Sequence, residues 1–152
     1  MDVDHFGISR IQEHLYLSSY KAALNYNVLK KLGITHILVV ASELSQCHEY
    51  VTDFEIMYID LDDDPTENIA CHFEDCNTFI GDIDDTAHTT LVHCMAGISR
   101  SASIVMAYLM KEYGMTCASA FKLCKEKRSI IRPNRGFRKQ LQEYETRLFY
   151  DL

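Results

Sequence analysis

The sequence predicts an α/β fold built on a central, mostly parallel and twisted sheet flanked by helices. Residues 34–41 are rich in β-branched side chains, which is typical of a buried strand, and residues 54–61 and 89–93 indicate two more strands. Segments with helical patterns separate these strands, and parallel strands need such crossover connections. At 152 residues the chain is long enough for one domain and too short for two ordinary ones.

The first half of the chain begins with a short strand at 14–17. An amphipathic helix is predicted over 20–31, and Gly33 is placed to end it, because glycine adopts the left-handed conformation that closes many helices. The strands at 34–41 and 54–61 come next.

The second half is mostly helical. A helix is predicted from Pro65 to about Asp82, because apolar residues recur there at helical spacing, namely Ile69, Phe73, Cys76 and Ile80. The strand at 89–93 leads into a helix over 99–113 that is apolar on nearly every side. Two further helices are predicted, at 116–127 and 134–149.

Composition excludes several classes of protein. Apolar residues make up 47% and charged residues 24%, with six Gly and two Pro, which excludes disordered, collagen-like and low-complexity chains. No apolar run approaches the roughly 20 residues that cross a bilayer. The first ten residues lack the apolar core of a signal peptide. We therefore expect a cytoplasmic protein without a membrane anchor, with the nucleus as a further compartment.

Charge is unevenly distributed along the chain. The net charge of −7 argues against a nonspecific nucleic-acid binder. Residues 122–139 nevertheless hold eight of the 15 basic residues beside a single acid, whereas residues 53–85 hold 12 of the 22 acids. The basic run is either a solvated helix face or a surface for acidic or phosphorylated partners.

The six cysteines predict neither disulfides nor a metal site. Thiols are expected to stay reduced without a secretory signal, and no pair of CxxC knuckles occurs. Cys117 and Cys124 are seven residues apart, so they share a helical face and are expected to pack as small apolar residues. Cys94 differs from the others because of its neighbours.

The strongest functional signal is the nonapeptide 93–101, HCMAGISRS, between a predicted strand and a predicted helix. Free backbone N–H groups and the helix dipole at such a junction form an anion site. Five residues separate Cys94 from Arg100, about enough backbone to encircle one tetrahedral oxyanion, and Gly97 can supply an unusual dihedral angle. Arg100 can then bind two oxygens of the anion with a bidentate fork. The loop residues expected to hold the phosphate are Met95, Ala96, Gly97, Ile98 and Ser99.

Cys94 is the candidate nucleophile of this loop. Amide donors, a helix N-terminus and a neighbouring arginine all favour the thiolate form of a cysteine. Ser101 is placed to donate a hydrogen bond to the sulfur, and His93 is expected to orient the loop through backbone bonds. The alternative is an ordinary strand-to-helix turn with a buried cysteine. The nucleotide loops GxxxxGK[ST] and GxGxxG do not occur in the sequence.

HCMAGISRS resembles the HCxxGxxRS signature of the cysteine-dependent protein tyrosine phosphatases, and its Ala96, Gly97 and Ser99 resemble the dual-specificity branch. Residues 15–18 are similar to the family's opening strand, 63–65 to its acid-bearing loop, and 131–145 to its closing helix. The whole chain is most similar to the small atypical dual specificity protein phosphatases, which consist of the catalytic domain alone. The resemblance thus implies one catalytic domain over residues 1–152, with the family's strand–loop–helix phosphate site and Asn134 as a supporting residue.

Expelling the leaving group needs a proton donor, for which the acidic loop offers Asp60, Asp62, Asp63 and Asp64. Asp64-Pro65-Thr66-Glu67 has the pattern of a capping box, so Asp64 is expected to bond backbone amides. Asp60 and Asp62 share one face if the strand continues, and Asp63 lies on the other. The resemblance selects Asp63, 31 positions before Cys94, and Asp62 remains the alternative.

The resemblance implies a two-step hydrolysis of phosphotyrosine and phosphoserine/phosphothreonine in proteins, through a cysteinyl-phosphate and without metal or cofactor. The loop side chains are uncharged, which argues against a phosphoinositide headgroup as substrate. Two alternatives remain open: a module that binds phosphoproteins without turning them over, and an enzyme that acts on RNA ends or lipids. The sequence does not predict the oligomeric state.

Overall fold

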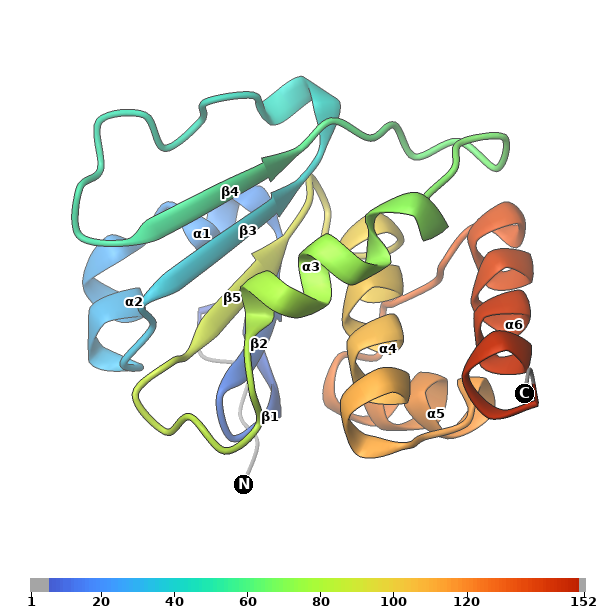
Figure 1. The fold of residues 1–152 in the computed structure, drawn as a ribbon. Helices are drawn as coiled ribbons and strands as arrows, with labels where there is room; N and C mark the ends of the chain where they lie inside the picture. The colour runs from blue at the N-terminus through green and yellow to red at the C-terminus, as the bar shows by residue number, and fades with distance from the viewer. Residues whose placement is uncertain (1–5, 151–152) are drawn as a thin grey trace.

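The strands form one five-stranded sheet in the order β1-β2-β5-β3-β4, seen at the left of Figure 1. The computed structural model describes residues 6–150. Strands β2, β5, β3 and β4 pair in parallel, and β1 pairs antiparallel with β2 at one edge. The strands are β1 (Ile8–Gln12), β2 (Leu15–Ser18), β3 (His36–Val40), β4 (Glu55–Ile59) and β5 (Thr90–His93). The predicted α/β class with a mostly parallel sheet is confirmed.

Helices cover both faces of the sheet (Figure 1). Short helices α1 (Tyr20–Ala23) and α2 (Tyr26–Lys31) pack on one face, where Ile37 and Val39 of β3 join their hydrophobic core. Leu38 and Val40 point to the opposite face, because side chains alternate along a strand. Four longer helices form the core there: α3 (Phe73–Ile80), α4 (Arg100–Tyr113), α5 (Cys117–Lys127) and α6 (Arg135–Phe149).

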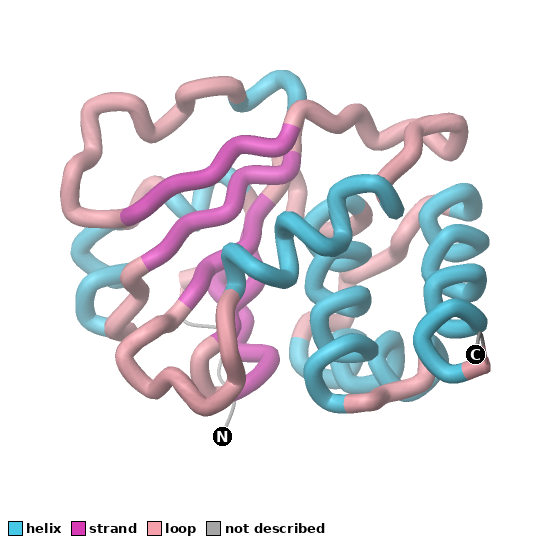
Figure 2. The backbone as a smooth tube through the Cα atoms, in the orientation of Figure 1, coloured by secondary structure: helices cyan, strands magenta, loops and turns pink. Residues whose placement is uncertain are grey.

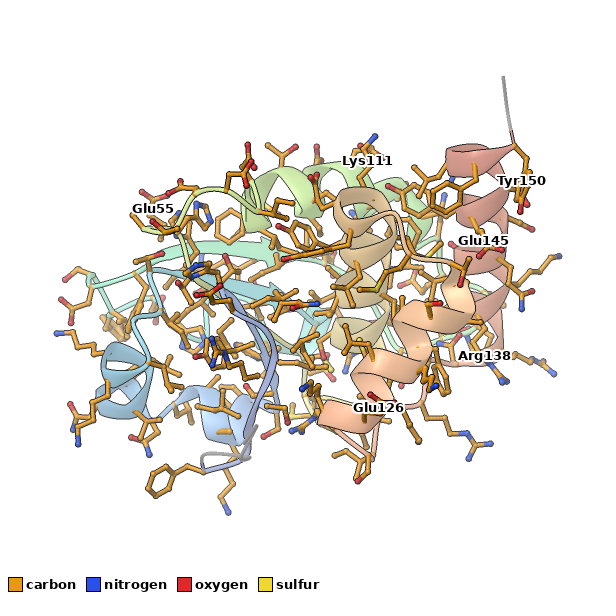
Figure 3. The ribbon with its side chains drawn as sticks, turned by 90° about the horizontal axis from the view of Figure 1, so that it is seen from below. Glu55, Lys111, Glu126, Arg138, Glu145 and Tyr150 are labelled. Atoms are coloured by element: carbon orange, nitrogen blue, oxygen red, sulfur yellow. The ribbon has the colours of Figure 1, made fainter. Side chains whose placement is uncertain are left out.

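Helix α4 is the central helix of that larger core. Its first eleven residues, from Arg100 to Met110, are all buried. Lys111 is the first exposed residue, and its side chain points away from the molecule (Figure 3). A helix that is apolar on nearly every side has to be surrounded, and α3, α5 and α6 surround this one.

Three elements differ from the sequence prediction. Strand β1 was not predicted, and it pairs with β2 across a two-residue connection. The helix expected over 20–31 is two helices. The first ends in a tight turn at its C-cap residue Leu24, and Asn25 is the N-cap residue of α2, a position that asparagine favours. Gly33 does end α2, with a φ of 77°.

The helix expected from Pro65 to about Asp82 is shorter at both ends. A 3₁₀ turn over Ala70–His72 precedes α3, which ends at Ile80, and residues 60–69 form a long loop (Figure 2). Glu67 Oε1 accepts a hydrogen bond from Asp62 N instead of closing a capping box at Asp64, so the loop is held without a helix at Pro65.

All six cysteines are free thiols, and Cys117 and Cys124 both contribute to the larger core, as predicted from their spacing. No helix within residues 6–150 is long and apolar enough to cross a membrane.

Candidate active site

The predicted anion loop lies at the carboxyl end of β5, between the sheet and α4. Strand β5 pairs with both β2 and β3, so the loop begins from the interior of the sheet. It reaches from Cys94 to Ser99, and α4 begins at Arg100. The first turn of this 14-residue helix presents free N–H groups, because Ser99 Oγ bonds Asn134 N at 3.0 Å rather than capping the helix.

The backbone carbonyls of the loop are bonded on its outer side. Met95 O accepts from Tyr20 N, Ile98 O from Arg132 N at 2.7 Å, and Ser99 O from Ser103 N at 2.9 Å. Ala96 O and Gly97 O accept from the side chain of Arg128. In a trans peptide the N–H points opposite to the carbonyl of the same unit, so the N–H groups of residues 96–100 are turned to the inner side. The loop is a nest of amides suited to one phosphate group.

Gly97 is required by the geometry of this loop. Its φ of 69° lies in the left-handed region, and a Cβ there would come within 2.7 Å of the backbone of Ser18 and of Arg128 Nη2. Glycine therefore supplies the unusual dihedral angle, as the sequence predicted, and it also permits the close approach of Ser18 and Arg128, which was not predicted.

Cys94 carries its sulfur into the loop. The residue is 2% exposed, and its Sγ lies 3.0 Å from Ser101 Oγ and 3.3 Å from Gly97 N. Ser101 and one loop amide, that of Gly97, are thus in contact with the sulfur.

Arg100 is buried and its fork is occupied by Glu43, a residue that the sequence analysis did not select. The two Nη atoms donate to the Glu43 carboxylate at 2.5 and 2.9 Å, and Nη1 also donates to Leu61 O. Burial alone would lower the pKa of Arg100, but Glu43 and the nearby Cys94 raise it, while Arg100 lowers the pKa of Glu43. Ser42 and Glu43 follow the buried strand β3 after one residue, and a polar pair at the carboxyl end of that strand was the available signal.

Arg128 was expected within a basic run that could be a solvated helix face, and the structure contradicts that interpretation for this residue. It is 7% exposed, and its Nε donates to Gly97 O at 2.9 Å. Its Nη atoms donate to Ala96 O and, across the sheet edge, to Gly7 O and Ser9 Oγ. Arg128 therefore joins the phosphate loop to β1 and holds two loop carbonyls outward.

His93 orients the loop through the backbone, as predicted, and it does so as part of a buried chain. Its Nδ1 bonds Cys94 O at 3.0 Å, its Nε2 lies 2.9 Å from His48 Nε2, and His48 Nδ1 lies 2.7 Å from Tyr26 Oη. Burial lowers the pKa of His93 to about 4 and lowers that of His48, so both rings are neutral near pH 7. His48 was not selected from the sequence.

Three of the four aspartates of the acidic loop have hydrogen bonds that distinguish them. Asp64 Oδ1 accepts from Thr66 N and Thr66 Oγ1, both at 2.8 Å, and these bonds lower the pKa of Asp64. Asp62 accepts from Ser42 Oγ on the side of β3. Asp63 instead accepts from Asn134 Nδ2 at 2.9 Å. Asp64 holds its proton poorly and Asp62 is turned to β3, so this arrangement favours Asp63 as the proton donor.

Asn134 links three parts of the site. Its Nδ2 donates to Asp63, its backbone N donates to Ser99 Oγ, and its Oδ1 caps α6 by accepting from Phe137 N. The acidic loop, residues 60–67, which we call the acid loop, also touches α6 directly. A Cβ on Gly136 would come within 1.9 Å of Pro65 O.

A hollow of about 370 Å³ opens beside the phosphate loop. Asp63, Ile98 and Ser99 line one side of it. Three exposed arginines from the basic run line it as well, namely Arg132, Arg135 and Arg138. Part of the basic run is therefore a positively charged surface next to the loop.

Met95 and Ala96 are exposed at the mouth of the loop, whereas Gly97 and Ser99 are buried and Ile98 is half-buried. The structure thus brings together every residue that the sequence singled out for the site: Cys94, Arg100, Asp63, Ser101, the five loop residues, His93 and Asn134.

Comparison with known proteins identifies a family that matches most of the chain. The family model for the dual specificity phosphatase catalytic domain matches residues 15–147. Dual specificity protein phosphatase 1 of Arabidopsis thaliana is 44% identical over 137 residues, which cover 90% of this chain and 68% of that protein.

Among solved structures, human DUSP28 superposes with a TM-score of 0.87 at 31% identity, over 93% of this chain and 95% of that one. The human tyrosine phosphatase-like serine/threonine/tyrosine-interacting protein superposes with a TM-score of 0.85 at 36% identity, over 93% and 97%.

Proposed function

This chain belongs to the dual specificity phosphatase family, and we propose that Cys94, Arg100, Asp63 and Ser101 carry its reaction. It is a protein phosphatase that hydrolyses phosphotyrosine and phosphoserine/phosphothreonine through a cysteinyl-phosphate, without a metal. The observation that supports the assignment of residues is the sulfur of Cys94, held by Ser101 Oγ and Gly97 N at the base of a nest of amides.

In the first step the Cys94 thiolate attacks phosphorus, and the bond from phosphorus to the substrate oxygen breaks. Asp63 protonates that oxygen as it leaves. The amides of residues 96–100 and the guanidinium of Arg100 bind the three remaining phosphate oxygens, where stabilisation of phosphoryl transfer is most effective. Glu43 holds Arg100 at the mouth of the loop, so a substrate phosphate shares that guanidinium with a carboxylate.

In the second step water attacks the cysteinyl-phosphate, and sulfur is the leaving group. Ser101 Oγ, 3.0 Å from Sγ, stabilises the departing thiolate by a hydrogen bond. Asp63, now ionised, takes the proton of the attacking water. The residue therefore alternates between acid and base, and the hydrogen bond that it accepts from Asn134 uses Oδ1 rather than Oδ2.

We further propose that the preferred phosphoproteins carry acidic groups near the phosphorylated residue. Arg132, Arg135 and Arg138 line the hollow beside the loop and complement negative charge there. The net charge of −7 disfavours nucleic acid as substrate.

Release of inorganic phosphate from an aryl phosphate in the presence of EDTA tests the assignment. The wild type should turn over, Cys94→Ser should lose about 10⁴-fold or more in kcat, and Cys71→Ser, at an exposed thiol, should match the wild type. Cys94→Ser should still bind a phosphopeptide, because backbone and Arg100 form the cradle.

The same experiment separates the enzyme from a phosphoprotein-binding module. A wild-type protein that binds phosphopeptides and releases no phosphate would be such a module. Full activity of Cys94→Ser would refute the covalent mechanism.

A further inference from the structure

Cys47, His48 and His93 bring three potential metal ligands together behind the phosphate loop. The Nε2 atoms of the two histidines are 2.9 Å apart, and one ligand atom from each of the three residues lies within 4.8 Å of the other two. Both histidines are buried and Cys47 is half-buried. Within residues 6–150 this is the single group of three such side chains with that spacing. Phosphoryl transfer uses neither Cys47 nor the Nε2 atoms.

The hydrogen bonds on the far side of each ring decide which nitrogen carries the proton. His93 Nδ1 faces Cys94 O, which only accepts, so Nδ1 carries the proton and Nε2 presents a lone pair. His48 then donates from Nε2 to His93 and accepts from Tyr26 Oη at Nδ1. One proton therefore lies between the two imidazoles.

We propose that Cys47, His48 and His93 form a site for Zn²⁺, in which the cation replaces that proton. Two imidazoles and one thiolate are the ligand types that Zn²⁺ favours, and a site with three protein ligands leaves a fourth position for water. Tetrahedral Zn²⁺ with bonds of about 2.1 Å to nitrogen places two ligand nitrogens roughly 3.4 Å apart. The rings have to separate by about 0.5 Å from their present contact, and each ring has to turn so that its Nε2 points at the metal rather than at the other ring.

Binding moves two protons. The Cys47 thiol gives its proton to solvent as the S–Zn bond forms. The His48 proton moves from Nε2 to Nδ1, where Tyr26 Oη becomes the acceptor, so the same hydrogen bond orients the ring in both states. One proton is released overall.

The proposed metal site takes no part in the catalytic reaction, but its ligands lie close in sequence to the nucleophile and to the partner of Arg100. His93 precedes the nucleophile, and Cys47 and His48 follow Glu43, the partner of Arg100, by four and five residues. Zn²⁺ would fix these two segments to each other.

Titration of the full chain carrying Cys94→Ser tests the proposal, since the catalytic sulfur can then no longer bind metal. We expect one equivalent of Zn²⁺ by calorimetry. Co²⁺ as a probe should give the visible bands of a tetrahedral site and a thiolate-to-cobalt charge-transfer band. Adding Cys47→Ser should remove the charge-transfer band and weaken Zn²⁺ binding about 100-fold or more, whereas adding Cys71→Ser should change neither.

Tyr26→Phe in the same background provides a second test, because it removes the acceptor for His48 Nδ1 and keeps all three ligands. It should weaken Zn²⁺ binding about 10-fold and leave the charge-transfer band in place. Circular dichroism establishes whether each variant is folded. If Cys47→Ser is unfolded, Zn²⁺ binding by Tyr26→Phe decides whether the proposal holds. No Zn²⁺ binding at micromolar concentration, or unchanged binding in the variants, would overturn the proposal.

Discussion

The phosphate loop, residues 94–99, and the acid loop, residues 60–67, both follow carboxyl ends of parallel strands but are held in different ways. In the phosphate loop, five consecutive carbonyls have donors on the outer side. The tip of the acid loop from Asp62 to Thr66 is exposed, and side-chain bonds such as that from Asn134 to Asp63 hold it.

The difference separates two parts of one reaction. The backbone of the phosphate loop is arranged before substrate arrives, so it stabilises the phosphate whatever the leaving group. The acid loop places one proton, which matters only when the leaving oxygen is basic. Damage to the first loop should therefore slow all substrates alike, and damage to the second should depend on the leaving group.

Among the variants that distinguish the two loops, Asp63→Asn should have the largest effect. A tyrosyl or alkyl oxygen needs the proton, so kcat for such substrates should fall roughly 10²- to 10⁴-fold, whereas an acidic phenol should lose much less. The measurement is kcat across aryl phosphates of graded leaving-group pKa, with Asp62→Asn as the matched variant. If Asp62→Asn alone steepened the dependence, the proton donor would be Asp62.

Gly97→Ala should lower kcat by about 10²-fold for good and poor leaving groups alike. A Cβ at a φ of 69° would lie 2.7 Å from the backbone of Ser18 and displace the loop, and small displacements of catalytic groups have effects of this size. Gly114→Ala is the control, because Gly114 has a φ of 65° with no atom within 4 Å of a Cβ. It should lower stability by about 1 kcal/mol and leave kcat unchanged. Equal kcat for the two variants would contradict the pre-arranged loop.

Gly136→Ala should act on the acid loop alone. Its Cβ would collide with Pro65 O and push Asp63 away from α6, so poor leaving groups should lose about 10-fold and good ones little. The exposed residue Lys139 on the same helix supplies the control, Lys139→Ala, which should retain wild-type rates. A loss that did not depend on the leaving group would mean that α6 also supports the phosphate loop.

The smallest effect concerns stability rather than rate. Burial lowers the pKa of His93 to about 4 from an ordinary value of 6.5, so between these values the unfolded chain binds the extra proton. The stability that comes from keeping His93 neutral is fully present above pH 6.5. It is lost as the pH falls toward 4, which lowers the free energy of unfolding by up to about 3 kcal/mol. Urea unfolding in EDTA from pH 7 to 4 measures the free energy of unfolding. His93→Gln should flatten this decline, and His72→Gln, at a half-buried residue, should not.

How much of the site could be predicted depended on how far apart its residues lie in the sequence. Cys94, Gly97 and Ser101 lie within eight residues between a strand and a helix, and local geometry alone places them together. Glu43 acts on Arg100 from 57 positions away and Arg128 on Gly97 from 31, and no periodic pattern connects such pairs. Strand β1 was not predicted either, because it pairs with β2 at the edge of the sheet and contains no run of buried apolar residues.

The sequence by itself determined the parallel sheet, the buried helix α4 and the anion loop with its nucleophile, because strand period, helix period and a strand-to-helix junction are local properties. Only the tertiary structure decided that Asp62 turns to Ser42 while Asp63 turns to Asn134, and that Arg100 rests on Glu43. Register in an exposed loop and pairing between distant charges depend on how the elements pack. For the same reason, His48 and His93 meet only in the folded protein.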